Sequence, residues 1–303
     1  MNNFRKYENS NTKIEETYML MLKNQTLEYQ KLMKEKYSNY PNLNINTWDI
    51  IEKLNSIIDE SDPDTDLPQI IHAYQTAQSI KKNYLNENYL LKNNLKIKNL
   101  FSENEWKNLP KNIKNIYNTD LDKLYSNILD WDWLYLVGFI HDLGKILLTE
   151  KFGNLDQWAV VGDTFPLGQK LDDEYIYENK NFHLNNESLL NNIYNDFCGF
   201  ESVIMSWGHD EYLASILERN STNLPKEAIY IIRFHSFYSW HTPKNKQGYI
   251  NLANNYDWYM LPLLKMFQKA DLYSKTKNIP NDNLIKKEFN IIFKKYNIET
   301  LSW

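Results

Sequence analysis

Apolar residues recur at intervals of three and four along most of the chain and seldom at intervals of two. This spacing is typical of helices that bury one face, and it leaves almost no signal for strands. The expected helices cover residues 11–40, 46–58, 70–80, 136–147, 209–217, 225–235 and 264–271, and a glycine turn within residues 202–217 places His209 at the start of its helix. The pattern therefore predicts an all-α fold.

Residues 136–147 carry apolar side chains at helical spacing and are predicted to form one buried amphipathic helix. His141, Asp142 and Lys145 lie within this helix, near one another around its axis. Ionisable groups are costly to bury unless they are paired or bind a metal ion. The run therefore has two interpretations: a metal-binding His-Asp pair beside a cation, or a hydrogen-bonded His-Asp pair beside a solvated lysine.

Two stretches depart from the helical pattern. Between about residues 83 and 130 Asn and Lys accumulate, and we expect an Asn/Lys-rich insertion at the surface of a single domain that spans residues 1–303. Residues 158–168 contain glycine and proline, which predict a loop with Asp163 exposed at its tip.

The composition narrows the class of protein. A formal net charge of -5 disfavours nucleic acid or a membrane surface as partner. The single cysteine, Cys198, excludes an internal disulfide framework and suits a reducing compartment. No apolar run reaches the about 18 residues that a membrane helix needs, and the first residues lack an apolar signal-peptide core. We expect a globular cytoplasmic protein.

Histidine and aspartate recur on the predicted core helices. Four of the six histidines and two aspartates lie within or at the ends of apolar helices: His72, His141, His209, His235, Asp142 and Asp271. His183 and His241 lie in polar, turn-like surroundings and are left out of the set. Nitrogen and oxygen ligands without thiolate suit iron or manganese better than structural zinc. Six ligands suit two ions, with Asp142 able to bridge them through both oxygens.

Longer stretches carry a resemblance to a known family. His72, the adjacent pair His141-Asp142 and Asp271 follow the ligand order of the HD-domain superfamily, and His209 and His235 match its two-metal members. More specifically, the chain resembles the myo-inositol oxygenase family, in the blocks 62–66, 72–77, 138–145, 157–166, 205–212, 232–242, 269–273 and 300–303. The resemblance runs from residue 4 to the C-terminus and is interrupted at about 83–130.

This resemblance implies an HD-domain-like helical bundle around a mixed-valent Fe(II)/Fe(III) centre. The implied reaction is O2-dependent cleavage of the myo-inositol ring to D-glucuronate, the first step of inositol catabolism, by a monomeric enzyme. The implied iron ligands are His72, His141, Asp142, His209, His235 and Asp271, with Lys145 as the catalytic group that stabilises an alkoxide. The implied substrate contacts are Arg5, Asp59, Asp62, Lys145, Gly162, Asp163, Ser236 and Lys275, with Tyr18 in a lid.

Two alternatives belong to other classes of protein. An HD-domain metal-dependent phosphohydrolase would use the same ligands, but it needs a cluster of Arg or Lys facing the ions. The acids Asp59, Asp62 and Asp163 near the expected pocket disfavour such an anionic substrate. A non-catalytic polyol- or metal-binding protein is the third possibility, because ligands alone do not establish turnover.

Overall fold

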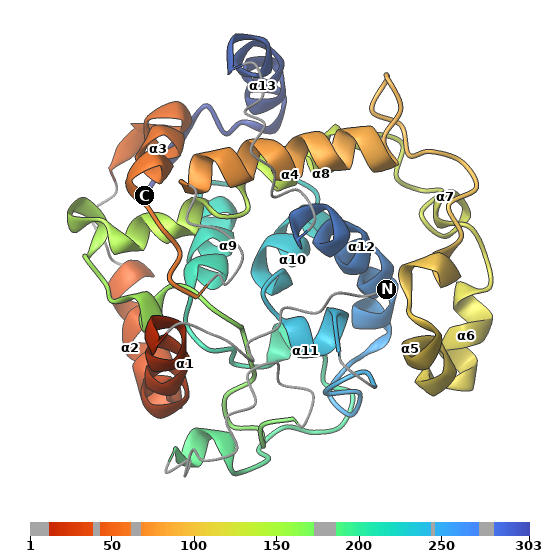
Figure 1. The fold of residues 1–303 in the computed structure, drawn as a ribbon, viewed down its shortest axis with the longest axis horizontal. Helices are drawn as coiled ribbons and strands as arrows, with labels where there is room; N and C mark the ends of the chain where they lie inside the picture. Colours follow the sequence, from red (N-terminus) through yellow and green to blue (C-terminus); the bar gives the residue numbers. More distant parts are fainter. Residues whose placement is uncertain (1–11, 39–42, 62–67, 173–185, 244–245, 273–281) are drawn as a thin grey trace.

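The computed structural model describes residues 12–38, 43–61, 68–172, 186–243, 246–272 and 282–303. Most of this part is helical, as the sequence predicts (Figure 1). The helices are α1 (Thr12–Asn24), α2 (Leu27–Ser38), α3 (Thr47–Lys53), α4 (Gln69–Tyr84), α5 (Glu103–Asn108), α6 (Lys111–Tyr117), α7 (Leu121–Leu124), α8 (Asp132–Ile140), α9 (His209–Arg219), α10 (Lys226–Phe234), α11 (Tyr238–His241), α12 (Asn255–Leu272) and α13 (Asp282–Tyr296).

Helices α4, α8, α10 and α12 form the centre of the molecule (Figure 1). Gly138 lets α8 approach α4 closely, because a Cβ at this position would lie 2.6 Å from Ile80 Cδ1 and 3.1 Å from Ala77 Cα. One buried apolar cluster extends from Met33 to Trp303. This continuity supports our proposal of a single domain. No helix in the described part of the chain has the length and hydropathy to cross a bilayer.

A short sheet is the exception to the helical fold. Strand β1 (Asn44–Asn46) pairs antiparallel with β2 (Thr300–Ser302), with Ile45 opposite Leu301. Both of these apolar side chains are buried, and the terminal Trp303 is fully buried beside them. The sheet therefore ties the C-terminus to the start of α3.

The predicted helix over residues 136–147 is wrong in its second half. Helix α8 ends at Ile140, and a 3₁₀ helix follows over Leu143–Leu148. Between them, Asp142 has φ −94° and ψ 2°, which lies in the sparsely populated region between helix and strand. The break coincides with a close backbone approach, because a Cβ on Gly144 would lie 1.9 Å from the carbonyl oxygen of His209. His141 and Asp142 therefore lie at the end of a helix, not in its middle.

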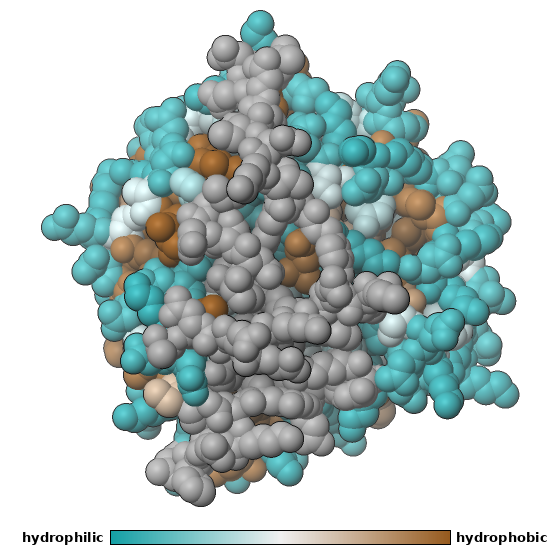
Figure 2. Space-filling model, in the orientation of Figure 1, coloured by the Kyte–Doolittle hydropathy of each residue, from teal (hydrophilic) through white to brown (hydrophobic). Residues whose placement is uncertain are grey.

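The expectation that the Asn/Lys-rich segment lies at the surface is also wrong in part. Its Asn and Lys side chains face outward, and Figure 2 shows mostly hydrophilic residues on that side. Its apolar residues join the main core: Leu91, Ile97, Leu100, Ile113, Tyr117, Leu121 and Tyr125 are all buried. The hydroxyls of Tyr117 and Tyr125 donate to the carbonyls of Trp258 and Tyr259 on α12. The segment is therefore part of the wall around α12.

Candidate metal centre

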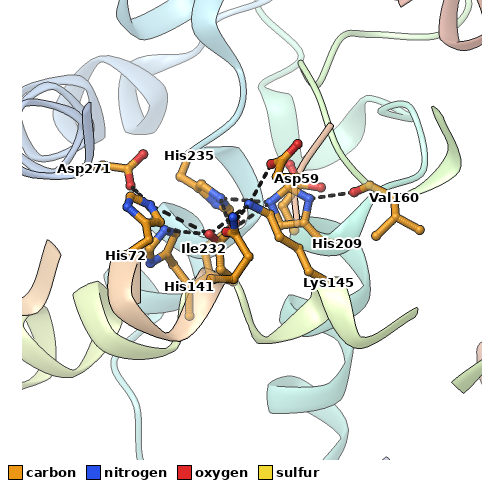
Figure 3. A network of polar contacts seen from close by, with 12 residues as sticks. Asp59, His72, His141, Lys145, Val160, His209, Ile232, His235 and Asp271 are labelled. Carbon is orange, nitrogen blue, oxygen red and sulfur yellow. Dashed lines mark hydrogen bonds and ion pairs between the residues drawn. The ribbon is translucent and has the colours of Figure 1, made fainter. Parts of the chain in front are cut away.

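Five elements deliver the predicted ligands to one buried place (Figure 3). His72 comes from the first turn of α4, and Asp271 comes from the last turn of α12. His141 and Asp142 follow the end of α8, His209 begins α9, and His235 follows α10. All six side chains are buried.

The Asp142 carboxylate lies between two pairs of histidines. Its Oδ1 is 3.3 Å from Nε2 of His209 and 3.7 Å from Nε2 of His235. Its Oδ2 is 3.5 Å from Nε2 of His141 and 3.8 Å from Nε2 of His72. Each oxygen therefore faces a different pair, and Asp142 belongs to both candidate metal-binding groups.

Asp271 completes the group that contains His72 and His141. Its Oδ1 lies 2.8 Å from Nε2 of His72 and 3.3 Å from Nε2 of His141. This half of the site therefore offers two imidazoles and two carboxylates, and the other half offers His209, His235 and the shared Asp142. Two ions that share Asp142 would satisfy both halves with nitrogen and oxygen donors.

Backbone carbonyls fix the orientation of three of the imidazole rings. Nδ1 of His141 lies 3.1 Å from the Gly138 oxygen. Nδ1 of His209 and of His235 lie 2.7 Å from the oxygens of Val160 and Ile232. Since a carbonyl only accepts, each Nδ1 carries the proton and donates it. In the neutral rings Nε2 is then left with its lone pair toward the centre, as metal-binding histidines require.

The contact between His209 and His235 tests whether a metal ion fits. Their Nε2 atoms lie 3.1 Å apart. With both protons on Nδ1, neither ring can donate to the other, and the two lone pairs repel unless a cation lies between them. Two nitrogens at right angles, each about 2.1 Å from an ion, are about 3.0 Å apart. The residues fit a bound ion.

The charge states of the carboxylates suit metal binding. Burial alone would raise the pKa of Asp142, but Lys145 and His141 outweigh it and hold that pKa well below its usual range. Burial is likewise outweighed at Asp271, whose pKa is held low by His72 and His141. Burial also lowers the pKa of His235, which favours the neutral ring that can bind an ion.

Lys145 lies directly beside the ligands. Its Nζ is 2.9 Å from Oδ2 of Asp142, 2.8 Å from Oδ2 of Asp59 and 3.0 Å from Oε1 of Gln69. Burial disfavours the ammonium, but the carboxylates of Asp142 and Asp59 outweigh burial and raise the pKa of Lys145. The side chain is therefore a cation whose three donors all have acceptors.

The remaining predicted site residues fall into three groups. Asp59, Gly162 and Ser236 line one cavity together with the six candidate ligands and Lys145. The volume of this cavity is about 30 Å³. Asp163 is buried, so its predicted exposure is wrong, and it accepts a hydrogen bond from the hydroxyl of Tyr18 at 2.8 Å. Arg5, Asp62 and Lys275 lie outside the described residues.

Sequence reasoning missed Gln69 and His241. Gln69 is the first residue of α4, and only its contact with Lys145 marks it. His241 is buried, and its Nε2 lies 2.8 Å from the carbonyl oxygen of His235. Burial, together with the nearby charge of Lys265, lowers the pKa of His241 to about 3. The large apolar side chain of Trp240, which precedes it in the sequence, was the available signal. His183 lies outside the described residues.

The fold and the site together define a mostly helical protein whose buried histidines and aspartates could bind two metal ions that share one carboxylate. A family model described as myo-inositol oxygenase matches residues 11–109 and 91–303. The chain belongs to the myo-inositol oxygenase family, which uses iron.

Proteins of this family from distant organisms resemble almost the whole chain. An inositol oxygenase of Dictyostelium discoideum is 39% identical over 99% of this chain and 89% of its own length. Inositol oxygenase 4 of Arabidopsis thaliana is 37% identical over 96% of this chain and 78% of its own. The inositol oxygenase of Mus musculus is 33% identical over 95% of this chain and 85% of its own. The similarity is therefore not confined to the metal-binding motifs.

Proposed function

We propose that this chain is an inositol oxygenase that uses O2 to open the ring of myo-inositol and form D-glucuronate. The observation that carries the proposal is the Asp142 carboxylate, whose two oxygens face two separate histidine pairs inside a chain that belongs to this family. The relatives quoted above are all named inositol oxygenase and match nearly the full chain.

We further propose two irons per chain in a mixed-valent state. His72, His141 and Asp271 would hold one ion, His209 and His235 would hold the other, and Asp142 would serve both. The bound ions would supply Lewis acidity toward a substrate hydroxyl and a redox-active centre through which electrons from the inositol ring reduce O2. The protein supplies a buried site that excludes bulk water, since all six ligand side chains are buried.

The role proposed for Lys145 is to hold negative charge on a substrate oxygen. Because its pKa is raised, it is a donor and not a base at neutral pH. The cavity of about 30 Å³ is smaller than an inositol ring, so substrate must displace existing contacts. We expect a ring hydroxyl to replace Asp59 or Gln69 at Lys145 Nζ, while the released carboxylate of Asp59 accepts from a neighbouring hydroxyl.

The other proposed substrate contacts differ in the observations that support them. Gly162 and Ser236 reach the cavity. Asp163 and the lid residue Tyr18 are joined to each other, which places both in one hydrogen-bonded unit. Arg5, Asp62 and Lys275 remain proposals from the family pattern alone.

Turnover assays separate this function from the alternatives. The full chain is purified without oxygen, loaded with iron, given myo-inositol and then exposed to O2, and uronate is measured. Phosphate release from a panel of phosphate esters is measured in parallel. Uronate without phosphate release supports the oxygenase. Phosphate release without uronate supports the phosphohydrolase, and the absence of both supports a binding protein.

One observation disfavours the phosphohydrolase. Among the described residues that line the cavity, Lys145 is the single Lys or Arg, and its donors are already paired. A phosphate ester needs several such donors.

We also propose that the protein is a cytoplasmic monomer. Light scattering on the eluting peak of a sizing column, at several loading concentrations, measures the mass directly. A mass near 36.4 kDa that does not change with concentration supports the monomer, and a doubled mass contradicts it. Fractionation of the source cells tests the compartment.

A further inference from the structure

A buried ion pair joins the 83–130 segment to helix α12. Lys265 of α12 donates to Oε1 of Glu105 at 2.5 Å, and the two side chains are only 6% and 4% exposed. Oε2 of Glu105 accepts from the backbone N–H of Ser102 at 2.7 Å. The Lys265 ammonium also lies over the ring of Phe101, 4.8 Å from its centroid. The pair is thus enclosed by residues of the 83–130 segment.

The same ammonium is connected to a candidate ligand through His241. Lys265 Nζ donates to the backbone carbonyl of His241 at 2.7 Å. The ring of His241 in turn contacts the carbonyl of His235, with Nε2 at 2.8 Å from the oxygen. Since this carbonyl only accepts, Nε2 carries the proton, and Nδ1 is free to accept from the Thr242 hydroxyl at 2.9 Å. Every polar group along the path then has a partner of the right kind.

His235 is held from two sides by these contacts. Its ring is oriented by the Nδ1 contact with Ile232 of its own helix. Its backbone, one residue beyond the end of α10, is held by His241. Partners of this kind, one step behind a metal ligand, orient the ligand and raise metal affinity.

We propose that Glu105, Lys265 and His241 form a relay of positioning residues that fixes His235 for metal binding. None of the three is among the described residues that line the cavity, so they act through His235 and not on substrate. The relay makes the Asn/Lys-rich segment a support of the metal centre. This inference rests on the proposed iron site but goes beyond its ligands.

The first test is a pair of variants at His241, studied in the full chain. His241→Phe removes the donor to His235, and His241→Gln keeps a side-chain N–H. Iron affinity is measured by competition with a chelator, and the electronic spectrum of the iron-loaded protein is recorded. We expect His241→Phe to weaken iron binding about tenfold or more and to change the spectrum. His241→Gln should recover part of both.

The second test separates positioning from stability. Lys265→Met leaves the Glu105 charge buried and unpaired, whereas the double variant Glu105→Leu with Lys265→Met removes both charges. We expect the double variant to regain resistance to urea but to keep the weakened iron affinity, because His241 has still lost the Lys265 donor. Asp120→Asn is the matched control, since it breaks a buried carboxylate's ion pair with Lys96 in the same segment. It should leave iron affinity unchanged.

Either of two results would overturn the proposed relay. The relay is refuted if His241→Phe binds iron with the affinity and spectrum of the unchanged protein. It is equally refuted if the double variant regains full iron affinity, because the ion pair is then only structural. If His241→Phe does not fold, the double variant decides. A failure of the unchanged protein to bind iron would instead remove the metal centre itself, and the inference with it.

Discussion

The Nζ atom of Lys145 lies 2.9 Å from Oδ2 of Asp142, on the oxygen that also faces His141 and His72. The other oxygen, Oδ1, faces His209 and His235, neither of which is a lysine or an arginine. The charge of Lys145 therefore acts on one side of the shared carboxylate. As a protonated amine it has no lone pair to give a metal, so its role is separate from that of the ligands.

This separation gives the first prediction. Lys145→Met should lower kcat by about 10²-fold, as does the loss of a donor that stabilises developing negative charge. The iron content should fall much less, because no ligand is removed. Lys145→Arg keeps the positive charge and should retain more activity than the methionine variant. Metal analysis and kcat are measured on the same samples, and a loss of iron in proportion to activity would contradict the assigned role.

The Asp59–Lys145 pair predicts how stability depends on pH. The pKa of Asp59 is lowered from 3.8 to about 2, since Lys145 outweighs the effect of burial. A lowered pKa in the folded state means that the stabilisation is complete above the unfolded pKa and is lost as the pH falls from about 4 toward 2. The linked contribution is on the order of 2 kcal/mol.

Urea unfolding of the iron-free protein at pH 6, 4 and 3 measures this effect. Asp59→Asn should cost most at pH 6, and the difference from the unchanged protein should shrink toward pH 3. Asp156→Asn serves as the control, because Asp156 is exposed and its Oδ2 accepts from the indole N–H of the half-buried Trp158. A difference for Asp59→Asn that is equal at all three pH values would show that its carboxylate charge is not the cause.

Much of the site was predictable because histidine and aspartate are unusual residues on the apolar face of a helix. Charged or polar residues such as His72 and Asp271 on apolar helix faces need partners, and the number of such residues points to a shared site. The break after α8 was not predictable from periodicity, since Leu143, Ile146 and Leu147 continue the helical spacing and are buried. The break coincides with the close approach of Gly144 to the distant His209, which leaves no local pattern in the sequence.

The buried role of the 83–130 segment was hidden for a different reason. Its composition is dominated by Asn and Lys, whose side chains are exposed. The residues of α12 that its buried side chains contact, Trp258, Tyr259 and Lys265, lie more than a hundred residues away in the sequence. Long-range hydrogen bonds of this kind leave no local pattern. His241 was missed for another reason: its neighbours in sequence suggested a turn, although its ring contacts His235 only six residues away.

Removing the core part of that segment is therefore expected to disrupt the protein. Replacing Glu103–Tyr117 with a short linker deletes Glu105, Ile113 and Tyr117, which are buried against the rest of the fold. Such a variant should be insoluble or free of iron. Shortening the exposed turn at Glu87–Asn88, between the paired residues Leu85 and Leu91, should leave a folded protein that binds iron. Equal tolerance of both deletions would show that the segment is only a surface insertion.

Gly144 supplies a prediction about the backbone. In Gly144→Ala the new methyl group would lie 1.9 Å from a backbone oxygen, so the turn that carries Asp142 and Lys145 must move away from His209. We expect a loss of about 3 kcal/mol in unfolding free energy and weakened iron binding. In Gly138→Ala the nearest atom is the end of the Ile80 side chain at 2.6 Å and the nearest backbone atom is Ala77 Cα at 3.1 Å, so the loss should be smaller. Denaturant unfolding and chelator competition compare the two, and a greater loss of iron affinity in Gly138→Ala would contradict this account.

The last prediction concerns the charge of the substrate. Asp59 lines the cavity together with Asp142 and Asp271, and a phosphate on the ring would bring its negative charge against these acids, where screening is weak. It would also add bulk to a small site. We therefore expect free myo-inositol to be turned over and inositol monophosphates to be rejected.

Asp163 and Tyr18 refine this test of the substrate pocket. Asp163→Asn keeps an oxygen that can accept from Tyr18 but replaces a charged acceptor by a neutral one, so we expect the KM for myo-inositol to rise about tenfold. Tyr18→Phe keeps the carboxylate and is the matched control for the loss of the hydrogen bond between Tyr18 and Asp163. Initial rates with the free polyol and with a monophosphate are compared in all three proteins. Comparable turnover of the two substrates by the unchanged protein would contradict the pocket assignment, even if two irons were bound. A site that accepts a phosphate would not derive its substrate specificity from these carboxylates.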